Sequence, residues 1–240
     1  MAIKFSETVS NQLLFGTWNV PASTSAFTMM CYATVTTNAQ TSYICGKASA
    51  TSANNQTWLF SINTTNNFLA LLKIGTTTTT LTASSGTFVL NTRYHLCMTY
   101  NGTIIRFYIN GTERTTASRT GTVATNTNQV GVSGLPGTPT NREFGGIVED
   151  WRIYTKVFTQ KEIDQVVSSE GRDGLYDNLY SWYPMQGGYQ GLAIPAGTTG
   201  TIKDWGSNKQ DGYLPTGNVS PVWNDSSLNF VSSPVRFLKQ

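Results

Sequence analysis

The chain contains few charged residues. Lys and Arg together account for 16 of its 240 residues and Asp and Glu for 13, so the formal net charge is only +3. No run of basic residues occurs in the sequence. Because nucleic-acid binding requires a basic stripe that neutralises phosphates, we expect no nucleic-acid partner.

Histidine and cysteine are also scarce. His95 is the single histidine, and Cys31, Cys45 and Cys97 show no C-x-x-C spacing. A histidine-rich zinc site and a Ser-His-Asp triad are therefore disfavoured. The cysteines stand in apolar, strand-like segments, so we expect buried thiols rather than a disulfide framework. His95 lies in the middle of an expected strand, where we predict a hydrogen-bonded structural histidine.

Long apolar stretches are also missing. No segment approaches the roughly 20 apolar residues that a membrane-spanning helix needs. The first residues, M-A-I-K-F-S-E-T-V, show no apolar core of a secretory signal peptide. We therefore expect a protein made in the cytoplasm without a signal peptide and without membrane insertion.

The most informative segment is 94–114, which reads Y-H-L-C-M-T-Y-N-G-T-I-I-R-F-Y-I-N-G-T-E-R. Its two Asn-Gly pairs, Asn101-Gly102 and Asn110-Gly111, lie between alternating apolar residues. Asn-Gly adopts the positive φ angles of a type I′ turn at low cost. The segment therefore predicts an antiparallel meander with two-residue turns. The residues expected to face the core are Tyr94, Leu96, Met98, Tyr100, Ile105, Phe107 and Ile109.

Four motifs of the chain resemble one known family. They are Tyr94-His95-Leu96, Tyr100-Asn101-Gly102, Tyr108-Ile109-Asn110-Gly111 and the segment 144–154, F-G-G-I-V-E-D-W-R-I-Y. In this order they resemble the laminin-G-like, concanavalin-A-like lectin/glucanase jelly rolls, over about residues 27–168. The resemblance implies an all-β fold, a two-sheet antiparallel jelly-roll sandwich with one short helix after its last strand.

The expected helix begins at a capping box. Thr159 and Glu162 are spaced so that each side chain satisfies a free backbone N–H of the first turn. Ile163, Val166 and Val167 then form a short apolar stripe. We therefore predict a helix that docks on the sandwich.

Residues 171–240 differ from the rest of the chain. Pro215, Pro221 and Pro234 interrupt this segment, which suits an extended arm. We predict a sandwich over 1–170 and a C-terminal β-rich extension over 171–240 that packs on the sandwich or on a partner. The chain is expected to form a homo-oligomer, and the residues expected at its interface are Pro234, Val235, Phe237 and Leu238.

Glu149 and Asp150 are the carboxylates in the position that suits a glycosidase. Neighbouring strand residues point to opposite faces, so these two should not act together. Val148 and Arg152 stand where further carboxylates would be needed. We therefore expect no enzyme, with Asp150 and Arg152 forming a structural ion pair and Glu149 anchoring a loop.

Oxygen-bearing side chains indicate a calcium site as the one cofactor to consider. Asp204, Asn208 and Asp211 form one cluster, and Asp173 with Asp177 forms another. Calcium takes six to eight oxygen ligands. The alternative is that these residues simply form turns.

Aromatic side chains in the C-terminal segment are candidates for sugar binding. Carbohydrate binding needs exposed aromatic rings beside hydroxyl and amide groups. Trp182, Trp205 and Trp223 stand in segments expected to be loops, with Tyr213 nearby in sequence. The alternative is that these rings fill a core or an interface.

Three functions follow from these observations. The absence of an export pattern, the low charge and the missing catalytic set favour a non-catalytic structural protein on a virion surface, such as a phage decoration protein that also adheres to glycans. The alternative is a carbohydrate-binding, lectin-like module of a secreted or cell-surface protein, with an extracellular location. A glycoside hydrolase is the least favoured of the three.

Overall fold

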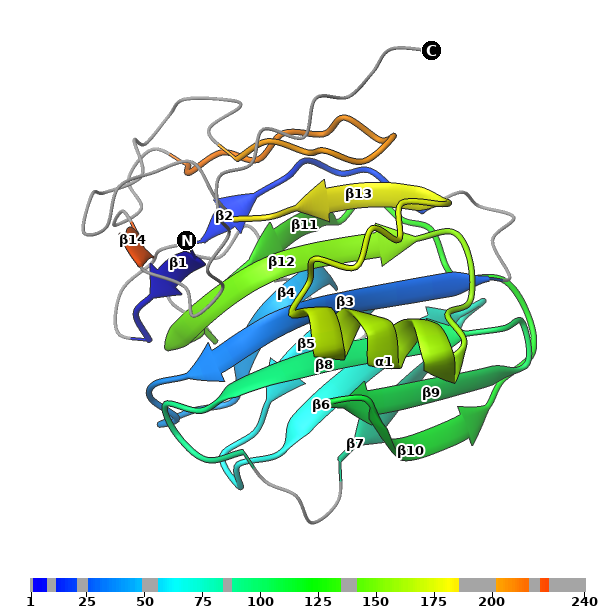
Figure 1. Ribbon diagram of the computed structural model, residues 1–240, viewed down its shortest axis with the longest axis horizontal. Helices are drawn as coiled ribbons and strands as arrows, with labels where there is room; N and C mark the ends of the chain where they lie inside the picture. The colour runs from blue at the N-terminus through cyan, green and yellow to red at the C-terminus, as the bar shows by residue number, and fades with distance from the viewer. Residues whose placement is uncertain are drawn as a thin grey trace.

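The computed structural model describes residues 2–7, 12–20, 26–48, 56–83, 88–134, 142–185, 202–215 and 221–224. Two antiparallel sheets pack face to face, and one helix lies across the outer face of the larger sheet (Figure 1). The predicted all-β, jelly-roll sandwich with one short helix is confirmed.

The larger sheet has eight strands and the smaller has six. The larger runs β10-β9-β8-β3-β12-β1-β14, with β13 also pairing with β12. Its strands are β1 (Ala2–Phe5), β3 (Phe27–Val35), β8 (Arg93–Tyr100), β9 (Ile104–Ile109), β10 (Thr112–Ser118), β12 (Gly146–Tyr154), β13 (Leu179–Tyr183) and β14 (Val222–Asn224). The smaller runs β2-β11-β4-β5-β6-β7. Its strands are β2 (Leu13–Leu14), β4 (Ser42–Ala48), β5 (Trp58–Ile62), β6 (Phe68–Ile74), β7 (Thr77–Thr82) and β11 (Gln129–Val132).

The main core lies between the two sheets. Inward-facing residues of both sheets fill it, and Trp58 of β5 and Trp151 of β12 meet there with ring centroids 6.3 Å apart. Burying one large apolar side chain stabilises the fold by roughly 1.5–3 kcal/mol. The residues predicted to face the core do so, with Tyr94 packing at its margin. The others are Leu96, Met98, Tyr100, Ile105, Phe107 and Ile109.

The two Asn-Gly turns differ from each other. Asn110 and Gly111 both have positive φ angles (50° and 79°), as the prediction of a type I′ turn requires. At the first turn only Gly102 does, at 90°. The side chain of Asn101 accepts hydrogen bonds from the backbone N–H groups of Thr103 and Ile104. Asn101 therefore stabilises the turn through its side chain, and only Gly102 takes the positive φ angle. The predicted type I′ turn at Asn101-Gly102 is therefore wrong.

Helix α1 (Gln160–Ser169) covers the outer face of the larger sheet. Its capping box is present as predicted, with reciprocal hydrogen bonds between Thr159 and Glu162. Ile163 and Val166 are buried against β3 and β8 residues, including Met30 and Cys97.

All three cysteines are buried, as predicted. In the described ranges no helix is long and apolar enough to cross a membrane.

Strand β12 contains a β-bulge. Glu149 pairs with Tyr32 and Arg152 with Met30, so β12 has one residue more than β3 between these pairs. Asp150, inside the bulge, has a φ of +50°. As a result Glu149 and Asp150 both point to the outer face, under α1, where each forms an ion pair. The expectation that they point to opposite faces is wrong, because a bulge interrupts the alternation.

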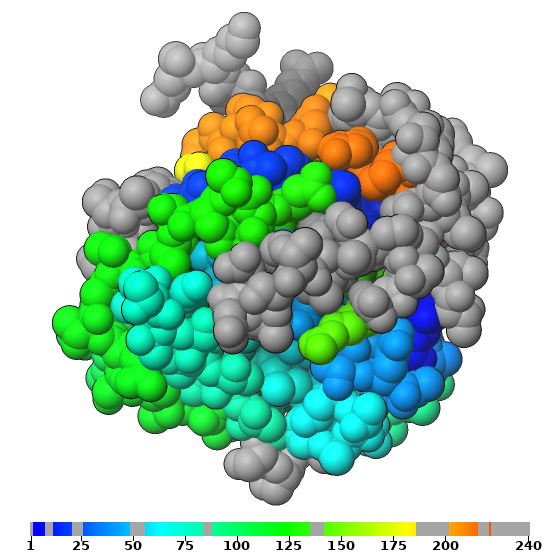
Figure 2. Space-filling model, turned by 180° about the vertical axis from the view of Figure 1, so that it is seen from behind, coloured from blue at the N-terminus to red at the C-terminus, as the bar shows by residue number. Residues whose placement is uncertain are grey.

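Strands β13 and β14 lie within the predicted extension 171–240. They pair with β12 and β1, so these parts of the segment belong to the larger sheet. Residues 202–215, orange in Figure 2, cross over the N-terminal segment, where Tyr213 forms a bridge with Leu14. The predicted interface residues lie outside the described residues; they are Pro234, Val235, Phe237 and Leu238.

The imidazole ring of His95 is buried without a hydrogen-bond partner among the described residues. It is 1% exposed, and both ring nitrogens lack a partner. The prediction of a hydrogen-bonded histidine is therefore wrong, because the ring instead packs 4.9 Å from the ring of Tyr32. Burial, assisted by the positive charges of Arg152 and Arg93, lowers the pKa of His95 from 6.5 to about 3.

We predict that His95→Phe flattens the acid dependence of stability. Between pH 6.5 and about pH 3 the unfolded chain binds a proton at His95 that the folded protein does not. This difference lowers the free energy of unfolding by about 1.4 kcal/mol for each pH unit of acidification in that window. Urea unfolding of the parent protein and of His95→Phe at pH 7, 6, 5 and 4 checks this. Titration of the carboxylates changes the stability of both proteins equally, so the difference between the two pH dependences reports His95. Parallel pH dependences would contradict it.

Candidate functional site

An aromatic cleft lies at the edge of the larger sheet, between β13 and the segment 202–215. We use this name for the residues that line a hollow of about 280 Å³. They are Tyr176, Leu179, Trp182, Trp205, Gly206, Ser207 and Lys209.

Three aromatic rings form the apolar wall of the cleft. The ring of Trp182 lies between the other two, 5.5 Å from Tyr176 at an interplanar angle of 31° and 5.9 Å from Trp205 at 64°. Tyr176 is 49% exposed and Trp205 is 53% exposed. A second hollow, of about 420 Å³, is lined by Lys203, Asp204, Trp205 and Lys209. Trp205 therefore presents its ring to both hollows.

Strand β13 positions Trp182. Trp182 pairs with Arg152 of β12, and its side chain lies on the outer face of the sheet, beside that residue. Leu179, Ser181 and Tyr183 of the same strand are buried. Trp182 was expected in a loop; it stands on a strand instead, because β13 completes the edge of β12 that β1 leaves open.

Asp204 organises the loop that carries Trp205. Its Oδ1 accepts hydrogen bonds from the backbone N–H groups of Trp182 (2.9 Å) and Gly206 (2.8 Å). Its Oδ2 accepts from the N–H of Gln210 (3.1 Å) and lies 3.4 Å from the hydroxyl of Tyr183. A single buried carboxylate thus fixes both ends of a short loop and joins it to β13.

The same loop runs along the free edge of β13. Trp205 N–H donates to the carbonyl of Trp182, and Asn208 N–H donates to that of Tyr180, both at 2.8 Å. A Cβ at Gly206 would overlap the Tyr180 carbonyl, so only glycine allows this close approach. The loop therefore holds the Trp205 ring beside Trp182.

The structure gives the predicted calcium ligands other contacts. Asp211 accepts from the N–H of Asp204 at 2.9 Å and pairs with Lys203 at 2.6 Å. Asn208 donates to the hydroxyl of Ser181 at 3.1 Å. In the part of the chain that is described, no group of three or more Asp, Glu, His or Cys side chains is arranged to hold a metal ion. Calcium binding stays a prediction, and these contacts show what the side chains do without it.

In the second predicted calcium cluster, Asp173 forms an ion pair with a buried arginine. The Asp173 carboxylate is fully buried and pairs with Arg152 at 2.8 Å. Asp177 belongs to the turn before β13. Both carboxylate oxygens of Asp173 therefore already bind the guanidinium of Arg152.

The structure brings together two of the four predicted sugar-binding residues. Trp182 and Trp205 share the cleft, whereas Tyr213 lies outside its lining. Trp223 pairs through its backbone with Ile3, and its side chain lies outside the described part of the structure. Sequence reasoning missed Tyr176. The available signal was an aromatic residue in the polar loop R-D-G-L-Y-D-N, where no strand or helix needs one.

Comparison with known proteins identifies the fold. Residues 8–164 match the family model of the concanavalin A-like lectin/glucanase superfamily. No curated protein matches the chain at a significant level.

The solved structures that are similar to this chain include the following three. A candidate carbohydrate-binding protein from Bacteroides ovatus is 16% identical, with a TM-score of 0.63 over 94% of this chain and 63% of its own. The chain thus spans less than two thirds of that protein. The native heptameric SAP-like pentraxin from Limulus polyphemus is 15% identical, with a TM-score of 0.62 over 95% and 97%. The CBM40 of Ruminococcus gnavus IT-sialidase, bound to α2,3-sialyllactose, is 15% identical, with a TM-score of 0.51 over 61% and 84%. At such identities the likeness concerns the fold.

We predict that Asp204→Ala destabilises the protein by about 2–4 kcal/mol, since it leaves several buried donors without an acceptor. Lys203→Ala is the matched control, because it removes an exposed ion pair next to the same residue and should cost less than about 1 kcal/mol. The free energy of unfolding in urea measures both. Equal losses would show that Asp204 does not organise the loop.

Proposed function

The chain belongs to the concanavalin A-like lectin/glucanase superfamily, and on this basis we propose that it is a non-catalytic carbohydrate-binding protein whose aromatic cleft holds the sugar. The observation that carries the proposal is the pair of half-exposed rings, Tyr176 and Trp205, on either side of Trp182. Large aromatic side chains normally bury most of their surface. Rings left uncovered around a hollow are suited to a ligand with an apolar face.

The cleft combines the two kinds of contact that a sugar requires. A pyranose ring has an apolar C–H face and a rim of hydroxyl groups. The rings of Trp205 and Tyr176 can stack on that face, and two polar residues, Ser207 and Lys209, line the same hollow. A mostly apolar cleft with a few polar groups is the usual form of a small-molecule site.

The acidic residues of β12 support the absence of glycosidase activity. Glu149 is 2% exposed and pairs with Arg93, while Asp150 is 1% exposed and pairs with Arg152. Both are buried on the outer face of the larger sheet, and neither lines the cleft. A glycosidase needs one protonated and one free carboxyl group that reach the scissile bond. We therefore infer binding without turnover.

The comparisons favour this proposal over a particle-surface role. Two of the similar structures carry carbohydrate binding in their names, and none of the three is named as a virion protein. The virion-surface function and location stay predictions, as does the homo-oligomer. The pentraxin is heptameric, which is a property of that protein.

We predict that Trp205→Ala weakens oligosaccharide binding by about tenfold or more, the effect of losing one well-packed aromatic contact. A glycan array, followed by calorimetry with cellohexaose, xylohexaose and α2,3-sialyllactose, measures it. Because Trp205 is 53% exposed but its ring contacts that of Trp182, the free energy of unfolding should fall by only about 1–2 kcal/mol, and the protein should stay folded.

Val89→Ala is the control for this experiment. Val89 is 65% exposed and lies outside the cleft lining, so its loss should leave binding unchanged. An array that stays blank for the parent protein at high concentration would refute carbohydrate binding. Equal binding by the parent and Trp205→Ala would place the sugar elsewhere.

A further inference from the structure

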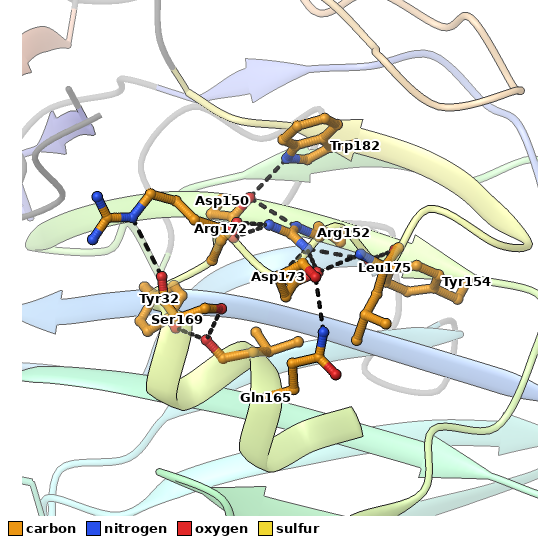
Figure 3. A network of polar contacts seen from close by, with 12 residues as sticks. Tyr32, Asp150, Arg152, Tyr154, Gln165, Ser169, Arg172, Asp173, Leu175 and Trp182 are labelled. Atoms are coloured by element: carbon orange, nitrogen blue, oxygen red, sulfur yellow. Dashed lines mark hydrogen bonds and ion pairs between the residues drawn. The ribbon is translucent and has the colours of Figure 1, made fainter. Parts of the chain in front are cut away.

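Beneath the aromatic cleft lies a buried network of charged side chains (Figure 3). Arg152 stands at its centre and binds two carboxylates. It donates to Asp150 through Nε (2.9 Å) and to Asp173 through Nη1 (2.8 Å), and its Nη2 lies 2.8 Å from Oδ2 of Asp150. These side chains are 1%, 1% and 0% exposed. Removing three charges from water is costly, and such a group is weak evidence for added stability. Added stability therefore does not explain why these charges are buried, and a role in the neighbouring cleft is the alternative.

One side of the network leads to Trp182. The indole N–H of Trp182 donates to Oδ1 of Asp150 at 2.7 Å, so a charge-assisted hydrogen bond fixes the rotation of the ring. The guanidinium carbon of Arg152 lies 5.1 Å from the centre of the same ring. Asp150 reaches Trp182 because the bulge in β12 turns its side chain to the outer face.

The other side leads to Tyr176. Oδ1 of Asp173 accepts from the backbone N–H of Leu175 at 2.8 Å, and the hydroxyl of Tyr154 donates to the carbonyl of Leu175 at 2.9 Å. Both backbone polar groups of Leu175 are thus held by the network. Tyr176 is the next residue, and its ring packs against Trp182.

The charges of the network explain why it requires these two contacts. One guanidinium against two carboxylates leaves a net negative charge in a buried place. Further N–H donors must stabilise that charge. The indole of Trp182 and the backbone N–H of Leu175 supply two of them. The network and the cleft geometry therefore depend on each other.

Given the proposed sugar-binding function, we infer that Asp150 and Asp173 are positioning residues of the aromatic cleft. Held together by Arg152, they fix the rings of Trp182 and Tyr176 in place before the ligand arrives. Neither carboxylate lines the cleft, so both act through the aromatic residues. A preformed platform binds more tightly because less ordering accompanies binding.

The test compares Asp150→Asn with Glu149→Gln. Both changes neutralise a buried carboxylate of the same bulge that is paired with an arginine, but only Asp150 contacts a cleft residue. Solvent exchange of the Trp182 indole proton, followed by NMR and assigned with Trp182→Phe, should become at least about tenfold faster in Asp150→Asn, the order expected for losing a charge-assisted hydrogen bond. Affinity for the oligosaccharide that binds the parent best should fall by about tenfold. Glu149→Gln should leave both within about twofold.

The outcomes separate this inference from the proposed function. If the parent protein binds none of the oligosaccharides, carbohydrate binding fails, and the indole exchange still decides whether Asp150 positions Trp182. Unchanged exchange in Asp150→Asn, or equal losses of affinity in both variants, would overturn the inference. If Asp150→Asn does not fold, the parent protein decides: the Trp182 indole proton should exchange more slowly than that of Trp205, and equal rates would overturn it.

Discussion

The bulge in β12 is the constraint on which the rest of this structure depends. Before the bulge, β12 pairs with β1 through Val148; after it, β12 pairs with β13 through Trp151 and Arg152. One extra residue thus coincides with the change of partner strand. It also turns Asp150 to the outer face, where Arg152 already points. The placement of Trp182, the ion-pair network and the open cleft all follow from this local irregularity.

The two faces of the larger sheet follow different energetic rules. Its inner face is apolar and packs on the smaller sheet, so hydrophobic burial accounts for its stability. Its outer face buries charges around Arg152 and leaves the ring nitrogens of His95 without a hydrogen-bond partner in the described residues. Replacing such charges with apolar side chains is often neutral or stabilising in proteins. The outer face nevertheless retains these buried charges directly under exposed aromatic rings. Such a departure from the most stable arrangement is expected near a functional site.

Local patterns in the sequence predicted the local structure well. The alternation in β8 and β9, the Asn110-Gly111 turn and the capping box of α1 each depend on residues close together in the chain. The bulge was missed because strict alternation was assumed through β12, whereas the core-facing residues change phase from Val148 to Trp151 across the polar pair Glu149-Asp150. Tyr176 was missed because its position depends on hydrogen bonds to Asp173 and Tyr154 through Leu175. Such contacts are set by the tertiary fold.

The family match and the cleft divide the chain in an informative way. The match covers residues 8–164 and includes Asp150 and Arg152, whereas all the residues that line the cleft come after it. The matched region therefore supplies most of the larger sheet, the bulge and two of the three buried charges, Asp150 and Arg152. The segment that follows supplies Asp173 and the rings of the cleft. Folds host many functions because their sites are built from such added elements. The matched region consequently contributes Asp150, which accepts the hydrogen bond of the Trp182 indole, while the segment after residue 164 contributes Asp204 and the whole lining of the cleft.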